Sequence, residues 1–302
     1  MSGINVAAGH ARLGFAGDTL NTAAYLARAF AHEATRVEYL IVLGSDALSE
    51  AMIRWMHDEG IGTTRIRRHP DRIPGIYAIE LDPAGERSFR YWRDRSAART
   101  LFDDSEAARE TLAGADVIYL SGITLAIISQ SARESLIAAC QAAKDGGRIV
   151  AFDSNFQSAL WQTVESGRAA FEAMWRATTI GLPSADDERA LYPAEKPEET
   201  IARLADYGVP EIVLKRGAAG PLIWRGGEIA SVNISSNFIA YFGKYPHTSS
   251  EVTRGNAVIG TNCQVHVLGT TLNFVGVGFL EGKSPGQPST KRRLGRRSRR
   301  SP

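Results

Sequence analysis

Hydrophobic positions along the first sixty residues follow a helical period and then a continuous apolar run. Residues 19–33 carry apolar side chains at helical spacing, and the apolar run 37–44 ends in glycine, as a buried parallel strand does. A second helical pattern covers 46–59 and stops at Gly60. This alternation predicts a parallel sheet covered by helices.

The same alternation returns in the second half of the chain. The expected strands cover 117–122, 148–153, 178–183 and 211–217, and the expected helices cover 129–144 and 197–206, with another beginning at Ser184. We therefore predict an α/β fold with a doubly wound, mostly parallel sheet. Functional groups should gather at the C-terminal ends of its strands.

Residues 75–93 interrupt this rhythm with a period of two. Apolar and polar positions alternate on both sides of the turn 82–85, which has the sequence Asp-Pro-Ala-Gly. This pattern predicts a β-hairpin. A hairpin inserted into an α/β chain is typical of a lid, so we expect a lid over about residues 70–97.

Composition sets limits on the class of protein. The 302 residues are 44% hydrophobic, and no apolar run reaches eighteen residues, so no transmembrane helix is expected. The N-terminus lacks the basic start and apolar core of a signal peptide. With only Cys140 and Cys263, the chain reads as a reduced, cytoplasmic protein without a metal-ligand cluster.

The composition changes abruptly near residue 231. Residues 1–230 contain 40 alanines and three asparagines, whereas residues 231–302 contain two alanines and five asparagines. A reading-frame shift, a fused foreign piece and a genuine β-rich end are the alternatives, and we favour the frame shift. The predicted organisation is one domain over 12–230 and an atypical segment over 231–302.

A basic tail dominates the net charge. Residues 291–300 hold seven basic residues, and without them the net charge of +2 would be −5. Basic tails can bind nucleic acid or a membrane surface. No aromatic residues interleave this one, as a nucleic-acid groove would require. We therefore interpret residues 283–302 as a disordered, solvated end and expect no nucleic-acid partner.

Two stretches carry side chains suited to a sugar substrate. Gly17, Asp18 and Asn21 begin the first helix, where backbone N–H groups can face a ligand, although a simple helix cap explains them equally well. Tyr91 and Arg93 share one face of the hairpin, opposite Tyr77 on its other strand. Arginine binds carboxylates bidentately, which suits a sugar acid; the alternative is an ordinary exposed strand face.

Three further stretches follow strand ends and suit phosphate chemistry. Residues 153–155, Asp-Ser-Asn, end one strand, as either a site or a helix cap. Ser184 and Asp187 open a helix and can organise magnesium or simply favour the helix dipole. A glycine-rich turn with Lys215, Gly217 and Gly220 follows another strand. Such a turn can hold a nucleotide phosphate, or it can simply connect two strands.

In this order, the stretches resemble the pfkB-type, ribokinase-like carbohydrate kinases. The resemblance covers about residues 12–230 and rests on GFAGDTLNTAAYLAR, PGIYAIELDPAGERSFRYWRDRSAAR, FDSNFQSALW, LPSADDE and IVLKRGAAG. Within the family the chain looks most like the kinases of 2-keto-3-deoxygluconate. The resemblance implies a ribokinase-like fold with a β lid, ATP and Mg²⁺ as cofactors, transfer of phosphate to the sugar acid's 6-hydroxyl, and a homodimer formed through the lid.

The resemblance also implies residue roles. Gly17, Asp18 and Asn21 would hold sugar hydroxyls. Tyr77, Tyr91 and Arg93 would hold the rest of the substrate, with Arg93 near its carboxylate. Ser184 and Asp187 would fall at the magnesium-phosphate motif, with Asp187 as the metal ligand, and Lys215, Gly217 and Gly220 would line the nucleotide site.

The chain departs from the family pattern in three places. A first strand is expected before Gly14 and is missing or malformed, and Gln157 stands where the family has arginine. The family's glycine-rich turn with its catalytic aspartate should follow residue 230, but no aspartate occurs after Asp206, so we nominate no catalytic residue. An active kinase, a non-catalytic sugar-acid binder and a non-functional product therefore stay open, with fructose or another ketose as the alternative substrate.

Overall fold

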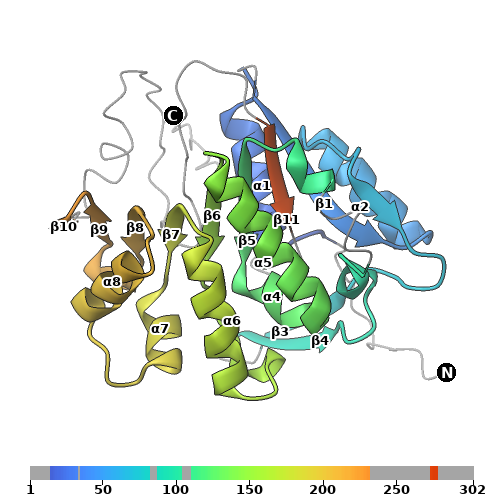
Figure 1. Cartoon of the computed structure of the whole chain (residues 1–302). Helices are drawn as coiled ribbons and strands as arrows, with labels where there is room; N and C mark the ends of the chain where they lie inside the picture. The colour runs from blue at the N-terminus through green and yellow to red at the C-terminus, as the bar shows by residue number, and fades with distance from the viewer. Residues whose placement is uncertain (1–13, 33–34, 82–86, 104–109, 232–272, 278–302) are drawn as a thin grey trace, which may run out of the picture.

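The computed structural model describes residues 14–32, 35–81, 87–103, 110–231 and 273–277 (Figure 1). Within these residues the main sheet has the strand order β10-β9-β8-β7-β6-β5-β11-β1-β2. Its strands are β1 (Arg36–Leu43), β2 (Ile66–Arg68), β5 (Val117–Ser121), β6 (Ile149–Asp153), β7 (Ile180–Leu182), β8 (Glu211–Leu214), β9 (Leu222–Arg225), β10 (Glu228–Ser231) and β11 (Asn273–Val277).

Parallel pairing joins every neighbouring pair from β8 to β2, whereas the pairs β8–β9 and β9–β10 are antiparallel. This confirms the predicted α/β fold with a mostly parallel sheet. The antiparallel end was not expected from the sequence, because the chain after β8 was interpreted only as a glycine-rich turn. Parallel strands end at one edge of the sheet, so residues that follow β5, β6, β7 and β8 lie near one another.

Helices connect the strands. They are α1 (Asp18–Ala29), α2 (Ala47–Asp58), α4 (Gly122–Ile127), α5 (Gln130–Asp145), α6 (Val164–Arg176), α7 (Ala185–Leu191) and α8 (Pro197–Asp206), with 3₁₀ turns η1 (Ala97–Thr100), η2 (Ser158–Leu160) and η3 (Gly217–Ala219). The helix predicted over 197–206 has those same bounds, because Pro197 occupies its first turn and Glu199 bonds back to the backbone of Lys196. Figure 1 shows α5 and α6 in front of β5 and β6.

The strand β11 occupies a central position in the sheet. It pairs in parallel with β1 on one side, from Arg36↔Asn273 to Leu40↔Val277, and with β5 on the other. The segment after residue 231 therefore contributes backbone pairing to the sheet. The predicted loss of a first strand concerns residues 1–13, which lie outside the described residues. The predicted frame shift and basic tail mostly concern residues 232–272 and 278–302, which also lie outside them.

A cluster of buried aromatic rings packs against β6. Phe152 lies at 5.4 Å from the ring of Phe171 and 4.6 Å from that of Trp175, both edge-to-face. Phe156, just beyond the strand, adds another edge contact to Phe171 at 5.5 Å. Such contacts add to the burial of large apolar surfaces and hold the end of β6 firmly against α6.

The predicted hairpin is present as a separate antiparallel sheet of β3 (Ile76–Leu81) and β4 (Arg87–Trp92). Its register pairs Tyr77 with Tyr91 and Ile76 with Trp92. The turn 82–85 lies outside the described residues. Figure 1 shows the hairpin below the arrowhead of β11, on the side where the parallel strands end, which is the position expected of a lid.

Candidate functional site

The first helix presents Asp18 at the C-terminal edge of the sheet. Gly17 is the N-cap of α1, and Asn21 lies one turn along, with its Oδ1 3.5 Å from the Gly17 nitrogen. The helix is tied to the sheet because the hydroxyls of Thr19 and Tyr39 lie 3.0 Å apart. The structure thus brings together the three residues predicted for sugar hydroxyls, with Asp18 buried.

Burial and a neighbouring carboxylate determine the protonation of Asp18. Burial, and after it the negative charge of Asp153, raise the pKa of the Asp18 carboxyl from 3.8 to about 6. The side chains of Ser121 and Asn155 and the ammonium of Lys215 act in the opposite direction. Asp18 is therefore mainly ionised at neutral pH, but it releases its proton less readily than an exposed aspartate.

The five residues 153–157, which we call the β6 turn, contact both halves of the predicted site. Lys215 donates hydrogen bonds of 2.7 and 2.8 Å to the two carboxylate oxygens of Asp153. The Ser154 hydroxyl donates to Asp187 at 2.7 Å and accepts from the backbone N–H of Ser184 at 2.9 Å. The turn therefore joins the ends of β6, β7 and β8.

The backbone of the β6 turn is specialised for this role. Asn155 has a φ of 28°, a left-handed conformation that asparagine tolerates better than most residues. Ser154 lies so close to α4 that a Cβ on Gly122 would stand 1.9 Å from its carbonyl oxygen. Glycine at 122 is thus required for the close approach of α4 to the turn.

The lid residues also meet this turn. Arg93 follows β4, its side chain is buried, and its Nη2 donates to Oε1 of Gln157 at 3.2 Å. The guanidinium carbon lies 4.3 Å from the centre of the Tyr91 ring, which confirms that these two residues share a face. Tyr77 packs against Tyr91 with ring centres 6.2 Å apart. All three predicted lid residues are therefore together.

The residues predicted for phosphate chemistry surround the ends of β7 and β8. Ser184 is the N-cap of α7 and forms a parallel bridge with Lys215. Gly217 and Gly220 have φ values of 55° and 75°, so the turn between them uses conformations that glycine adopts without strain. The Lys215 ammonium, however, is directed to Asp153 rather than over this turn.

Asp187 has the surroundings of a carboxylate that can accept a cation. Burial raises the pKa of its carboxyl, while the Ser154 hydroxyl, the Lys215 charge and the Phe156 backbone N–H lower it. Its hard oxygen atoms fit magnesium, which often uses one or two carboxylates and keeps several waters. No cluster of three or more metal-ligating side chains is found in the part of the chain that the structure describes.

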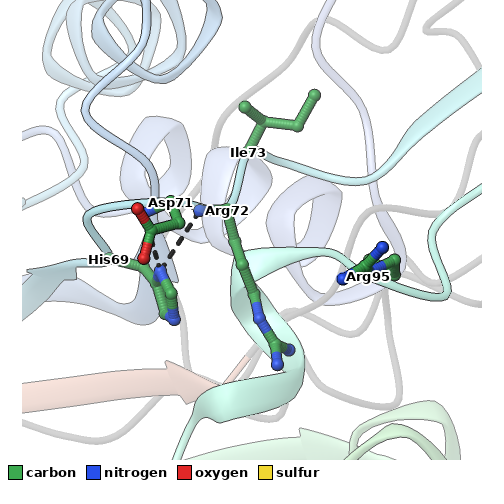
Figure 2. Close-up of a pocket in the computed structure, with 5 residues that line it drawn as sticks. All are labelled: His69, Asp71, Arg72, Ile73 and Arg95. Carbon is green, nitrogen blue, oxygen red and sulfur yellow. Dashed lines mark hydrogen bonds between the residues drawn. The ribbon is translucent and has the colours of Figure 1, made fainter.

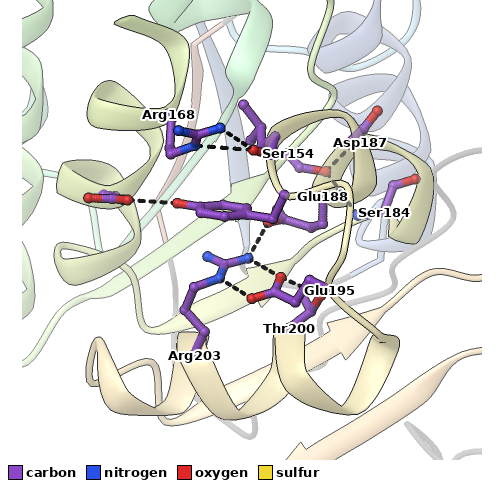
Figure 3. A network of polar contacts seen from close by, with 11 residues as sticks. Ser154, Arg168, Ser184, Asp187, Glu188, Glu195, Thr200 and Arg203 are labelled. Atoms are coloured by element: carbon purple, nitrogen blue, oxygen red, sulfur yellow. Dashed lines mark hydrogen bonds and ion pairs between the residues drawn. The ribbon is translucent and has the colours of Figure 1, made fainter. Parts of the chain in front are cut away.

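A buried ionic network behind Asp187 fixes α7 on α8 (Figure 3). Glu188 is almost fully buried and accepts a hydrogen bond of 2.7 Å from Arg203. Arg203 also binds Glu195 through two bonds of 2.7 and 2.8 Å. Burial raises the pKa of Glu188 to about 7 despite the opposing effect of Arg203. This network holds the helix that carries Asp187.

An open pocket of about 650 Å³ lies at the base of the lid (Figure 2). His69 accepts backbone N–H bonds from Asp71 and Arg72 through its Nδ1, at 3.0 and 3.1 Å. The pocket shares no residue with the β6 turn. Its lining residues are His69, Asp71, Arg72, Ile73 and Arg95.

The sequence analysis did not predict two contacts of the β6 turn, Asp153 with Lys215 and Gln157 with Arg93. Residues 153–155 were recognised as strand-end polar residues, but Asp153 was not nominated, and Gln157 was treated only as a lost anion contact. A buried acid at one strand end and a lysine just past another strand are a signal for such a pair. No sequence spacing connects Gln157 with Arg93, which is 64 residues away.

A model of the family described as "pfkB family carbohydrate kinase" matches residues 2–235. The chain belongs to the pfkB family of carbohydrate kinases. The 2-dehydro-3-deoxygluconokinase of Escherichia coli strain K12 is 40% identical over 217 residues, which are 71% of this pfkB-family chain and 70% of that protein. The enzyme of the same name from Dickeya dadantii is 41% identical with the same coverage. This name denotes a kinase of 2-keto-3-deoxygluconate, so the resemblance found in the sequence is confirmed.

Solved structures agree with the pfkB-family fold. A PfkB protein from Polaromonas sp. JS666 has a TM-score of 0.67 at 23% identity, covering 77% of this chain and 76% of that one. The 2-dehydro-3-deoxygluconokinase from Thermotoga maritima has a TM-score of 0.62 at 19% identity, covering 72% and 70%. At these identities the likeness shows the ribokinase-like fold alone. Among the described helices none is both long and apolar enough to cross a bilayer.

Proposed function

We propose that the chain binds a sugar acid together with ATP and Mg²⁺ and directs phosphate to the terminal hydroxyl of that acid. On this proposal the substrate is 2-keto-3-deoxygluconate and the product is its 6-phosphate. The observation that carries the proposal is the β6 turn, because it lies against Arg93 and Asp18 on one side and Asp187 and Lys215 on the other. One element thus supports groups suited to both substrates.

The sugar side favours an acid over a neutral ketose. The guanidinium of Arg93 can bind a carboxylate through two parallel hydrogen bonds. Its burial beside Tyr91 excludes water, which strengthens attraction to an anion. Fructose, the alternative substrate, has no carboxylate for this guanidinium to bind. Asp18, ionised at neutral pH, can accept hydrogen bonds from sugar hydroxyls.

The phosphate side combines a cation, a turn and a metal ligand. Lys215 carries positive charge at the end of β8, and backbone N–H groups near Gly217 and Gly220 can hold phosphate oxygens. Asp187 would hold Mg²⁺, directly or through its waters. When bound, this ion neutralises the charge of the phosphate groups. The Ser154 hydroxyl keeps Asp187 oriented for this role.

The proton of the attacking hydroxyl has no assigned acceptor among these groups. Asp153 is paired with Lys215, Asp187 is assigned to the metal, and Asp18 to hydroxyl binding. A general base contributes about 10²–10⁴-fold, and an anion hole contributes roughly 10²–10³-fold. Because no aspartate follows Asp206 to supply the family's base, we propose slow turnover with substrate binding retained. A non-catalytic binder is the alternative that the same observation supports.

The hairpin also supports the proposal of a homodimer through the lid. Ile76 and Trp92, which face each other across its two strands, are 39% and 53% exposed. Exposed apolar side chains that cluster on one face mark a contact surface more often than scattered ones do. A second copy of the chain is the occupant that we propose for this face.

Release of ADP, measured in a coupled assay with saturating Mg²⁺ and ATP, tests the proposed function. We expect release that depends on 2-keto-3-deoxygluconate and proceeds at least about 10⁴-fold below a typical enzyme rate of ~10 s⁻¹. Faster release with fructose would contradict the proposed substrate. No release despite measurable binding of the sugar acid would favour the non-catalytic binder.

Two variants make the assay specific. Arg93→Ala should remove the preference for the sugar acid over fructose. Arg90→Ala is the matched control, because Arg90 lies three residues before Arg93, within β4, and is exposed. An equal loss in both variants would show that the lid, rather than the buried guanidinium, is responsible.

A further inference from the structure

Arg93 needs a fixed partner if it is to select a substrate. It follows the last residue of β4, and β4 pairs only with β3 within the described residues, so the hairpin by itself gives little rigidity. A buried charge also needs compensating contacts. The ring of Tyr91 provides one at 4.3 Å, and the side-chain oxygen of Gln157 provides another at 3.2 Å.

Gln157 is well placed to act as that partner, because its backbone is held on both sides. It directly follows Phe156, whose buried ring packs against Phe171 and lies 6.4 Å from that of Trp161. It is also the N-cap residue of η2. The position of its amide is thus set by the core of the main domain, and the hydrogen bond carries that rigidity to the lid.

We propose that Gln157 is a positioning residue that holds the Arg93 guanidinium in place for the carboxylate of the substrate. This inference rests on the proposed function and deepens it by naming a determinant of acid specificity. Guanidinium has only donors, so the amide must turn its oxygen towards Arg93. The contact orients the guanidinium without neutralising its charge.

The chemical identity of residue 157 decides what Arg93 can bind. A carboxylate here would form an ion pair with Arg93 and compete with the ligand for its donors. An arginine, the residue that the family resemblance leads one to expect, would place a second positive charge beside the first. The neutral amide adds no charge of either sign beside Arg93.

The inference is tested by calorimetric titration of the full-length chain with 2-keto-3-deoxygluconate and with its uncharged carboxamide. We expect Gln157→Ala to weaken binding of the acid about 5- to 10-fold, within the range for the net contribution of a typical hydrogen bond. Binding of the carboxamide should change little. Gln157→Glu should weaken binding of the acid more than Gln157→Ala does.

Gln141→Ala is the matched control, because Gln141 is on the surface of α5, where its amide bonds to Asp145. Equal affinity of Gln157→Ala and the wild-type chain for the acid would overturn the inference. An equal loss for the acid and the carboxamide would also overturn it, because that result would indicate a general structural defect.

A second measurement needs no ligand and separates this inference from the proposed function. The rate at which phenylglyoxal modifies Arg93 is followed by peptide mass spectrometry. We expect Gln157→Ala to raise this rate severalfold relative to the wild type and Gln141→Ala. If the wild type fails to bind the acid, the proposed function fails. The modification rate of Arg93 then decides by itself whether Gln157 positions Arg93. An unchanged rate in Gln157→Ala would refute that role.

Discussion

The ammonium nitrogen of Lys215 lies 2.7 and 2.8 Å from the two carboxylate oxygens of Asp153, across the strand β7 that separates β8 from β6. Only 3% of the Asp153 side chain and 25% of the Lys215 side chain are exposed. The negative charge of Asp153 raises the pKa of Asp18, and the positive charge of Lys215 partly opposes this effect. This contact joins the two sides of the site that we propose for the sugar and for the phosphate.

Lys215→Met should destabilise the fold strongly, since it leaves Asp153 buried without its charged partner. We expect a loss of about 3–5 kcal/mol in the free energy of unfolding, measured by urea denaturation. The double variant Lys215→Met/Asp153→Asn should recover much of this loss. The exposed pair Arg189–Asp186 provides the control, and Arg189→Met should cost no more than about 1 kcal/mol. Equal effects of the two single variants would contradict the buried pairing.

Asp18→Asn should stabilise the chain in a pH-dependent way. The Asp18 carboxyl has a pKa of about 6 in the folded chain and of about 3.8 when the chain is unfolded, so the unfolded chain releases this proton at lower pH. Asp18 therefore destabilises the fold increasingly as the pH rises from about 4 to about 6. The stability difference between the variant and the wild type should be smallest below about pH 4. Above about pH 6 it should reach on the order of 1–3 kcal/mol. Thermal unfolding at pH 4, 5, 6 and 8 measures it, and a difference independent of pH would contradict this prediction.

Trp92→Ser should weaken association between copies of the chain. The exposed indole lies opposite Ile76 on the proposed contact face, so its removal takes away a large apolar anchor. Sedimentation velocity should show a dimer for the wild type and a shift towards monomer for the variant. Tyr25→Ser, at an exposed aromatic on α1, is the control. A wild type that stays monomeric at micromolar concentration would contradict the proposed dimer.

Val275→Pro should destabilise the sheet, because β11 pairs with β1 and β5 on its two sides. Proline removes a backbone N–H and is poorly tolerated in a central strand. We expect a loss of about 1–3 kcal/mol in the free energy of unfolding, the cost of leaving a buried backbone group without its hydrogen bond. Val275→Ala keeps the N–H and should cost much less. A proline variant as stable as the alanine variant would show that this segment does not contribute to the folded sheet.

The sequence predicted elements whose signals are local. The predicted helix 197–206 coincides with α8, and the period of two around residues 82–85 located the hairpin. The position of β11 could not be predicted, because strand order depends on pairing between segments far apart in the chain. A short apolar run such as 273–277 has no pattern that names its neighbours.

The candidate site was predicted in part for the same reason. Gly17, Asp18 and Asn21 are close in sequence, so their proximity follows from one helical turn. The contacts of Lys215 with Asp153 and of Arg93 with Gln157 span 62 and 64 residues. They depend on which strand ends and which lid face meet, and this is a property of the folded chain.

Calorimetric titration of 2-keto-3-deoxygluconate into the full-length chain, with Mg²⁺ and a non-hydrolysable ATP analogue present, tests the central claim most directly. The account predicts binding at submillimolar concentration that weakens at least about tenfold in Arg93→Ala, the loss of a charged contact. Arg90→Ala should bind as the wild type does. The absence of heat at millimolar sugar acid, or equal affinity of Arg93→Ala and the wild type, would contradict the account.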